Sequence, residues 1–145
     1  MARNGVFVEA PPAKVFEVLA DAPGYSRWVV GTHEVRHADG HWPKAGAAFG
    51  YTAGLPPLLT LKDETVVLES EPPSRLVLEI RARPLPNARV CFQLEPRDGG
   101  TQLTMVEDMA NPVLNMLAGP AFHAAVRIRN WETLRRLKSV AEHPA

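Results

Sequence analysis

The sequence predicts an α+β fold in which a curved antiparallel β-sheet of about seven strands wraps around a long C-terminal α-helix. Three observations lead to this prediction. Hydrophobic residues recur with a period of two between positions 29 and 109, the period becomes 3.6 after Asn111, and two short helical segments lie between the first strand and the second. A sheet with one apolar face must bury that face, and the last helix is the only element large enough to cover it.

The N-terminal part of the chain predicts one strand and two short helices. Residues 3–9 are extended, and Pro11-Pro12 then precedes apolar residues at helical spacing over 13–20. Proline suits the first turn of a helix, so these prolines mark its start. The sequence Asp21-Ala-Pro-Gly ends this helix, and Tyr25-Ser-Arg-Trp28 predicts a second short turn of helix.

Six further strands are predicted from the alternation of apolar and polar residues. We expect them over residues 29–37, 47–53, 58–70, 75–83, 88–96 and 101–109. Asp39-Gly40, Pro72-Pro73, the segment 84–87 and Asp98-Gly99-Gly100 are typical of the turns between them. The last three strands have one apolar and one polar face, as an antiparallel sheet covered on one side requires.

The C-terminal part predicts a short helix followed by a long one. Pro112 to Ala118 forms the first, Gly119-Pro120 interrupts it, and the second runs to about residue 142. At 1.5 Å per residue the long helix spans about 34 Å, enough to cross the whole sheet. A curved sheet closed over one diagonal helix leaves a gap, which we expect to be an apolar pocket.

Inward-facing apolar residues should form the walls of this pocket. They are Leu78, Ile80, Val90, Phe92, Leu103 and Met105 on the sheet, and Phe122 and Val126 on the long helix. Large rings suit ligand pockets and cores alike, and Trp42, Phe49 and Tyr51 are the candidates for a pocket wall or lid. For Trp28, core packing under the short helices is the better interpretation.

Polar residues within these apolar patterns are the candidates for site chemistry. Asn130 interrupts the apolar stripe of the long helix, together with Arg129. Burying an amide without a partner costs about 1–3 kcal/mol, so Asn130 should face a solvated or ligand-filled cavity or cap a neighbouring strand. Glu64 is a further pocket candidate, although the register of its strand is ambiguous.

Glu107 is the carboxylate best placed to enter the pocket. It falls in register with Met105 if its strand has no bulge, and burial would then raise its pKa and suit it to acid–base chemistry. A bulge near the strand end would instead send Glu107 to solvent and Asp108 inward.

Composition excludes several classes of function. The 16 basic and 16 acidic side chains cancel, which argues against nucleic acid and against an anionic membrane surface as partner. Cys91 is the only cysteine, which suits a reducing compartment. With neither a signal-peptide pattern nor an apolar run long enough to span a bilayer, we expect a cytoplasmic protein. No metal-ligand spacing or cofactor fingerprint occurs, so neither a metal nor a cofactor is expected.

The order of elements and several short motifs resemble the SRPBCC superfamily of START and Bet v 1-like proteins, and most of all its polyketide cyclase/dehydrase-like branch. The motifs are Ala10 to Asp21 (APPAKVFEVLAD), Tyr25 to Trp28 (YSRW), Trp42-Pro43 with Gly46 and Phe49, Glu71 to Leu76 (EPPSRL), Gly100 to Met105 (GTQLTM) with Glu107, and Arg129-Asn130 with Leu134 to Leu137. The resemblance implies a helix-grip fold and one domain over residues 1–145.

This resemblance implies binding of a small hydrophobic molecule, such as a lipid or polyketide, in an internal pocket. Asn130 and Glu107, with Tyr51, would then provide its polar contacts. One alternative is an enzyme similar to polyketide aromatase/cyclases, in which Glu107 or Tyr51 moves a proton. Another is an interaction module, monomer or homodimer, that docks a partner through the apolar loop 54–59.

Overall fold

The computed structural model describes residues 2–30, 32–55, 59–81 and 86–143. The centre of the apolar loop 54–59, considered above as a docking surface, lies outside these ranges. No helix in the described ranges combines the length and the hydropathy needed to cross a bilayer.

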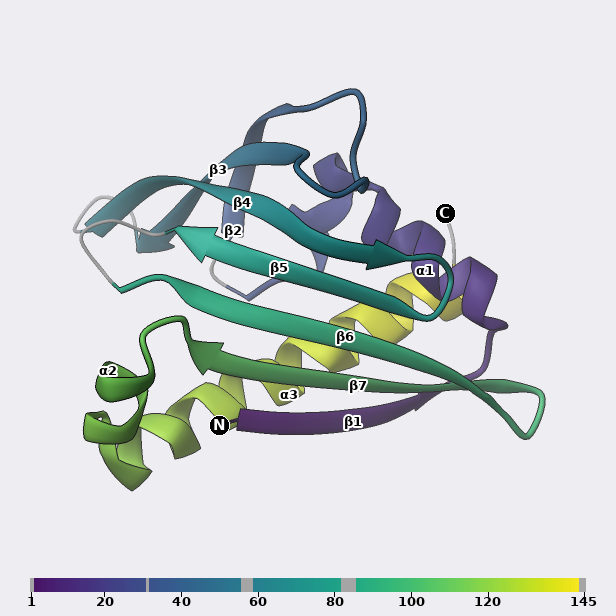
Figure 1. Cartoon of the computed structure of the whole chain (residues 1–145). Coiled ribbons are helices and arrows are strands. Elements are labelled where there is room, and N and C mark those ends of the chain that lie inside the picture. Colours follow the sequence, from purple (N-terminus) through teal and green to yellow (C-terminus); the bar gives the residue numbers. More distant parts are fainter. Residues whose placement is uncertain (1, 31, 56–58, 82–85, 144–145) are drawn as a thin grey trace.

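Seven antiparallel strands form one curved sheet, as the alternating pattern predicted (Figure 1). In chain order they are β1 (Ala2–Val8), β2 (Thr32–Ala38), β3 (Ala48–Leu55), β4 (Leu59–Glu71), β5 (Arg75–Arg81), β6 (Ala88–Arg97) and β7 (Gly100–Met109). Strands β2 to β7 are neighbours in sequence order, and β1 joins the far edge beside β7. The Asp98-Gly99 turn has positive φ at both residues, as the tight β6–β7 hairpin requires.

Two short helices connect β1 to β2, and two helices follow β7. These are α1 (Pro12–Ala20), the 3-10 helix η1 (Ala22–Arg27), α2 (Pro112–Leu117) and α3 (Gly119–Glu142). The break predicted at Gly119-Pro120 is present, and Gly119 there has a φ of 84°. In Figure 1 the yellow-green α3 crosses the sheet on its concave side, so the predicted helix-grip arrangement is confirmed.

Only the C-terminal half of α3 is packed into the core. Leu134, Leu137 and Ala141 are buried, whereas Phe122 near the helix start is exposed. The predicted apolar stripe is therefore covered over half its length. In Figure 1 α1 lies beside the C-terminal part of α3, and no residue of α2 is buried. The space between the sheet and the first half of α3 is not filled by either helix.

Candidate functional site

A cavity of about 380 Å³ lies between the sheet, η1 and the first half of α3. Apolar side chains dominate its lining. Among the residues predicted for its walls, those that line it are Phe49, Tyr51, Leu78, Ile80, Val90, Phe92, Met105, Glu107, Phe122 and Val126. Alternation along β5, β6 and β7 explains this agreement, because residues two apart on a strand share a face.

Aromatic rings fill the end of the cavity beside η1. The ring centroid of Tyr25 lies 4.4 Å from that of Trp28 and 4.9 Å from that of Phe49. The ring centroids of Trp28 and Phe92 are 6.0 Å apart. Tyr25 and Trp28 line the cavity as well as the core, so Trp28 has a second role beyond the predicted packing. The predicted Tyr25-Ser-Arg-Trp28 turn was the sequence signal that could have placed Tyr25 and Trp28 in the cavity lining.

Trp42 does not line the cavity, contrary to prediction. Its indole Nε1 donates a hydrogen bond to the carbonyl oxygen of Leu19 at 3.0 Å, and its ring packs against Phe49 with centroids 4.7 Å apart. This bond holds the indole against the end of α1. Trp42 thus supports Phe49 from behind.

The phenol of Tyr25 is buried and hydrogen-bonded. Its hydroxyl donates to the carbonyl oxygen of Leu19 at 2.7 Å. Burial raises the pKa of Tyr25 well above its ordinary value, and the nearby carboxylate of Asp21 raises it further. Tyr25 therefore stays protonated in the folded protein under conditions in which an exposed tyrosine ionises.

We predict a loss of stability at alkaline pH that depends on Tyr25. Above about pH 10 the unfolded chain releases the phenol proton while the folded chain retains it, so the free energy of unfolding falls by up to about 1.4 kcal/mol per pH unit. Below that pH the phenol is protonated in both states, so Tyr25 does not change the free energy of unfolding with pH. Urea denaturation between pH 8 and 11 should show a shallower decline for Tyr25→Phe than for the wild type. Parallel declines in the two proteins would contradict the prediction.

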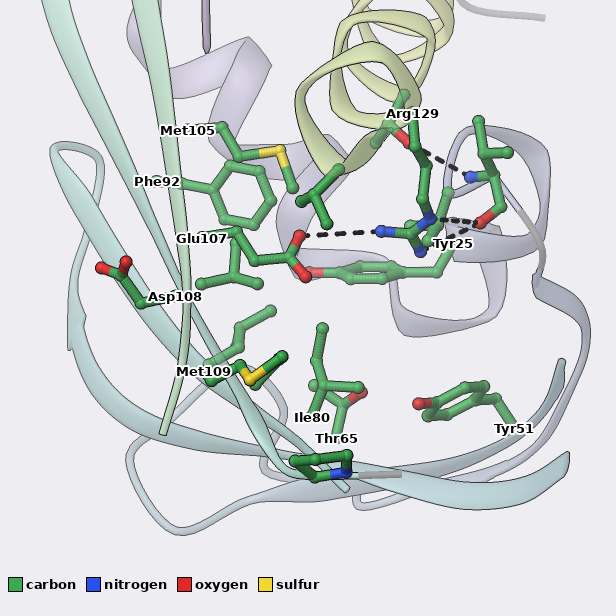
Figure 2. Close-up of a pocket in the computed structure, with 18 of the residues that line it drawn as sticks. Tyr25, Tyr51, Thr65, Ile80, Phe92, Met105, Glu107, Asp108, Met109 and Arg129 are labelled. Atoms are coloured by element: carbon green, nitrogen blue, oxygen red, sulfur yellow. Dashed lines mark hydrogen bonds and ion pairs between the residues drawn. The ribbon is translucent and has the colours of Figure 1, made fainter. Parts of the chain in front are cut away.

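Glu107 and Arg129 line one charged corner of the cavity, and Asn130 contacts both of them. Strands β6 and β7 pair without a bulge, with Val90 opposite Glu107 and Phe92 opposite Met105, so Glu107 faces inward as the unbulged register predicted. Figure 2 shows Glu107 and Arg129 pointing toward each other. Glu107 Oε1 lies 3.6 Å from Arg129 Nη1, and it accepts a hydrogen bond from Asn130 Nδ2 at 3.0 Å.

Arg129 also connects α3 to the segment after η1. Its Nε and Nη2 donate to the carbonyl oxygen of Val30 at 3.3 and 3.0 Å. The backbone N–H of Val30 in turn donates to Thr133 Oγ1 at 3.2 Å. Residues one turn apart on α3 thereby hold both polar backbone groups of Val30. The sequence showed Arg129 beside Asn130 as an interruption of the apolar stripe, and the arginine was not chosen as a site residue.

Asn130 follows neither of the two predicted alternatives. It is fully buried and does not line the cavity, and its bonding partners are side chains and not strand backbone. Besides donating to Glu107, it accepts a hydrogen bond from Arg129 Nη1 at 3.3 Å. Asn130 therefore holds Glu107 and Arg129 in place from the buried side of the pair.

Leu103 and Glu64 also lie outside the cavity. Leu103 is fully buried, opposite Val6 on β1 and Leu94 on β6, in the part of the sheet covered by the packed half of α3. Glu64 is exposed and pairs with Arg81 at 3.1 Å. Its neighbour Thr65 is buried and pairs with Ile80 on the inner face of the sheet, so Glu64, one residue before it, lies on the outer face.

A second polar group lines the cavity at its α2 end. Asn115 Oδ1 accepts a hydrogen bond from the backbone N–H of Met109 at 3.1 Å, and its Nδ2 lies 3.4 Å from Asp108 Oδ1. The Nε2 atom of His123 lies 2.9 Å from the carbonyl oxygen of Asn115. The sequence indicated only Asp108 of this group, as the inward residue of a bulged strand, and the segment from the end of β7 through α2 to α3 brings the three residues together. Within the described residues, no cluster of three or more side chains suits a metal ion.

Comparison with known proteins agrees with this architecture. The model of a family described as polyketide cyclase / dehydrase and lipid transport matches residues 3–142. The chain belongs to this family. Membership confirms the resemblance drawn from the motifs. No curated protein matches the sequence significantly.

Several solved structures share the fold at low sequence identity. Protein CV1439 from Chromobacterium violaceum has a TM-score of 0.75 at 18% identity, with 97% of this chain and 96% of that chain covered. The Aha1 dimer from Colwellia psychrerythraea has a TM-score of 0.69 at 15% identity, with 98% and 96% covered. DynU16, from the dynemicin biosynthetic locus, has a TM-score of 0.70 at 19% identity, and the match covers 98% of this chain and 47% of that one.

Proposed function

We propose that this protein binds a small, largely apolar molecule in the cavity between the sheet and the first half of α3. The observation that carries the proposal is a cavity of about 380 Å³ whose lining is predominantly apolar, with charged side chains gathered at two places. This size and composition are typical of small-molecule sites. Affinity would come from burial of apolar ligand surface, at about 25 cal/mol per Å².

The family supports this proposal without naming a ligand. Its description joins cyclase and dehydrase chemistry with lipid transport, and an apolar cavity suits the hydrophobic molecules that the description names. Glu107 and Tyr51 both line the cavity, so catalysis by either residue stays a hypothesis. Binding needs only the cavity, and it is the function we put forward.

Filling the cavity should abolish binding. Naphthalene serves as an apolar probe, and at ten times its Kd it should stabilise the wild type by about 1.4 kcal/mol in thermal unfolding. In Ile80→Trp the indole would occupy the cavity that Ile80 lines, and the naphthalene-induced shift should disappear. Ile128→Trp is the matched control, because Ile128 is 71% exposed on α3, and its shift should equal that of the wild type.

Two results would count against ligand binding in the cavity. One is a wild type whose unfolding temperature does not respond to naphthalene. The other is an equal response in Ile80→Trp and in the wild type, because the probe would then be bound elsewhere.

A further inference from the structure

The charged corner of the cavity has a definite hydrogen-bonding character. Both contacts of the Glu107 carboxylate, to Asn130 and to Arg129, involve its Oε1 atom. Its Oε2 atom makes no hydrogen bond to any residue within the described ranges, and the side chain is 13% exposed where it lines the cavity. An ionised carboxylate accepts hydrogen bonds and cannot donate them. The corner therefore presents an open acceptor to the cavity.

The positive charge at this corner belongs to Arg129, and it is already paired within the protein. Arg129 Nε and Nη2 both donate to the carbonyl oxygen of Val30. Nη1, the remaining nitrogen, donates to Asn130 Oδ1 and lies 3.6 Å from Glu107 Oε1. Three of the five N–H groups of the guanidinium thus donate to partners within the protein, and its charge is balanced by Glu107. An anionic ligand group would find no unbalanced cation there.

From this geometry we infer that the ligand is a neutral molecule whose apolar body carries a hydroxyl group, and that the pocket discriminates against the corresponding carboxylate. The inference rests on the proposed binding function. A hydroxyl that donates to Glu107 Oε2 makes a charge-assisted hydrogen bond, which is stronger than one between neutral groups. A carboxylate at the same position would be repelled by Glu107 and would lose its hydration without a counter-charge.

The same geometry predicts how this selectivity can be reversed. Glu107→Gln keeps the shape of the side chain, and the amide oxygen can still accept the hydrogen bond from Asn130. The substitution removes the negative charge that balances Arg129. A carboxylate ligand then gains an unbalanced cation close by, and a hydroxyl ligand loses its charged acceptor.

Three probes with one ring system test the inference. Naphthalene, 2-naphthol and 2-naphthoate are titrated at pH 7 by calorimetry into the wild type, Glu107→Gln and Glu64→Gln. Glu64 is the matched control, because it is also paired with an arginine, Arg81 at 3.1 Å, but outside the cavity. We expect the wild type and Glu64→Gln to bind 2-naphthol at least tenfold more tightly than naphthalene or 2-naphthoate. In Glu107→Gln the preference for 2-naphthol over 2-naphthoate should fall at least tenfold.

The outcomes separate this inference from the proposed function. If the wild type binds all three probes with equal affinity, the cavity binds apolar molecules and the inference is wrong. Tighter binding of 2-naphthoate than of 2-naphthol would also overturn it. If none of the probes binds, the proposed function fails and the inference with it. The wild-type comparison decides the question even if Glu107→Gln does not fold.

Discussion

Replacing Trp28 with alanine should lower the free energy of unfolding by about 3–5 kcal/mol, the usual effect of removing a buried tryptophan. Trp28 is 1% exposed, and its ring packs against both Tyr25 and Phe92. It therefore joins η1 to the centre of the sheet at the closed end of the cavity. Its loss would enlarge the cavity and remove both ring contacts. Urea denaturation followed by far-UV circular dichroism measures the effect.

Trp131 provides the matched control for this substitution. It lies on α3 and is 61% exposed, so Trp131→Ala should change the free energy of unfolding by about 0.5 kcal/mol or less. If both alanine variants lose a similar amount of unfolding free energy, the contacts of Trp28 with Tyr25 and Phe92 do not stabilise the fold as described.

Replacing Asn130 with alanine should lower the free energy of unfolding by about 1.5–3 kcal/mol, the range for hydrogen bonds to charged groups. The amide of Asn130 is fully buried between Arg129 and Glu107, and it bonds to both. Its removal would leave Glu107 with Arg129 as its only partner among the described residues. The measurement is again urea denaturation, at a pH near neutrality.

Asn87 is the control for this second prediction. Its Nδ2 donates to Glu79 Oε1 at 3.1 Å, so it makes the same kind of bond in a partly buried position near the surface. Asn87→Ala should therefore cost about 1 kcal/mol or less. An Asn130→Ala variant as stable as Asn87→Ala would show that the charged corner contributes little to folding.

Most of the fold could be predicted from the sequence, because the signals that determine it are local. The change of period at Asn111 marks the switch from strands to helices, and Asp98-Gly99 has the turn chemistry that joins β6 to β7. Pattern and structure agree there because backbone geometry sets both. The boundaries shifted most at η1, which begins at Ala22 and not at Tyr25, and at β2, which begins at Thr32 and not at residue 29.

The cavity walls were predictable where apolar residues occupy only one face of a strand. Ile80 and Met105 lie on such strands and were placed correctly. Apolar residues occur on both faces of β4, so its pattern left the position of Glu64 ambiguous, and the structure places Glu64 on the outer face beside the buried Thr65. The bond between Asn130 and Glu107 joins residues 23 positions apart. No local pattern encodes such a bond, because it depends on how α3 is placed over β7.

The place of β1 in the sheet has a consequence for how the chain folds. Each of β2 to β6 meets its next neighbour within a short stretch of chain, whereas β1 pairs only with β7, with Val8 opposite Thr101. Closing so long a loop is entropically costly, and folds dominated by such distant pairings form slowly. During synthesis, the first strand leaves the ribosome long before its partner exists. The sheet edge formed by β7 stays unpaired until β1 docks against it.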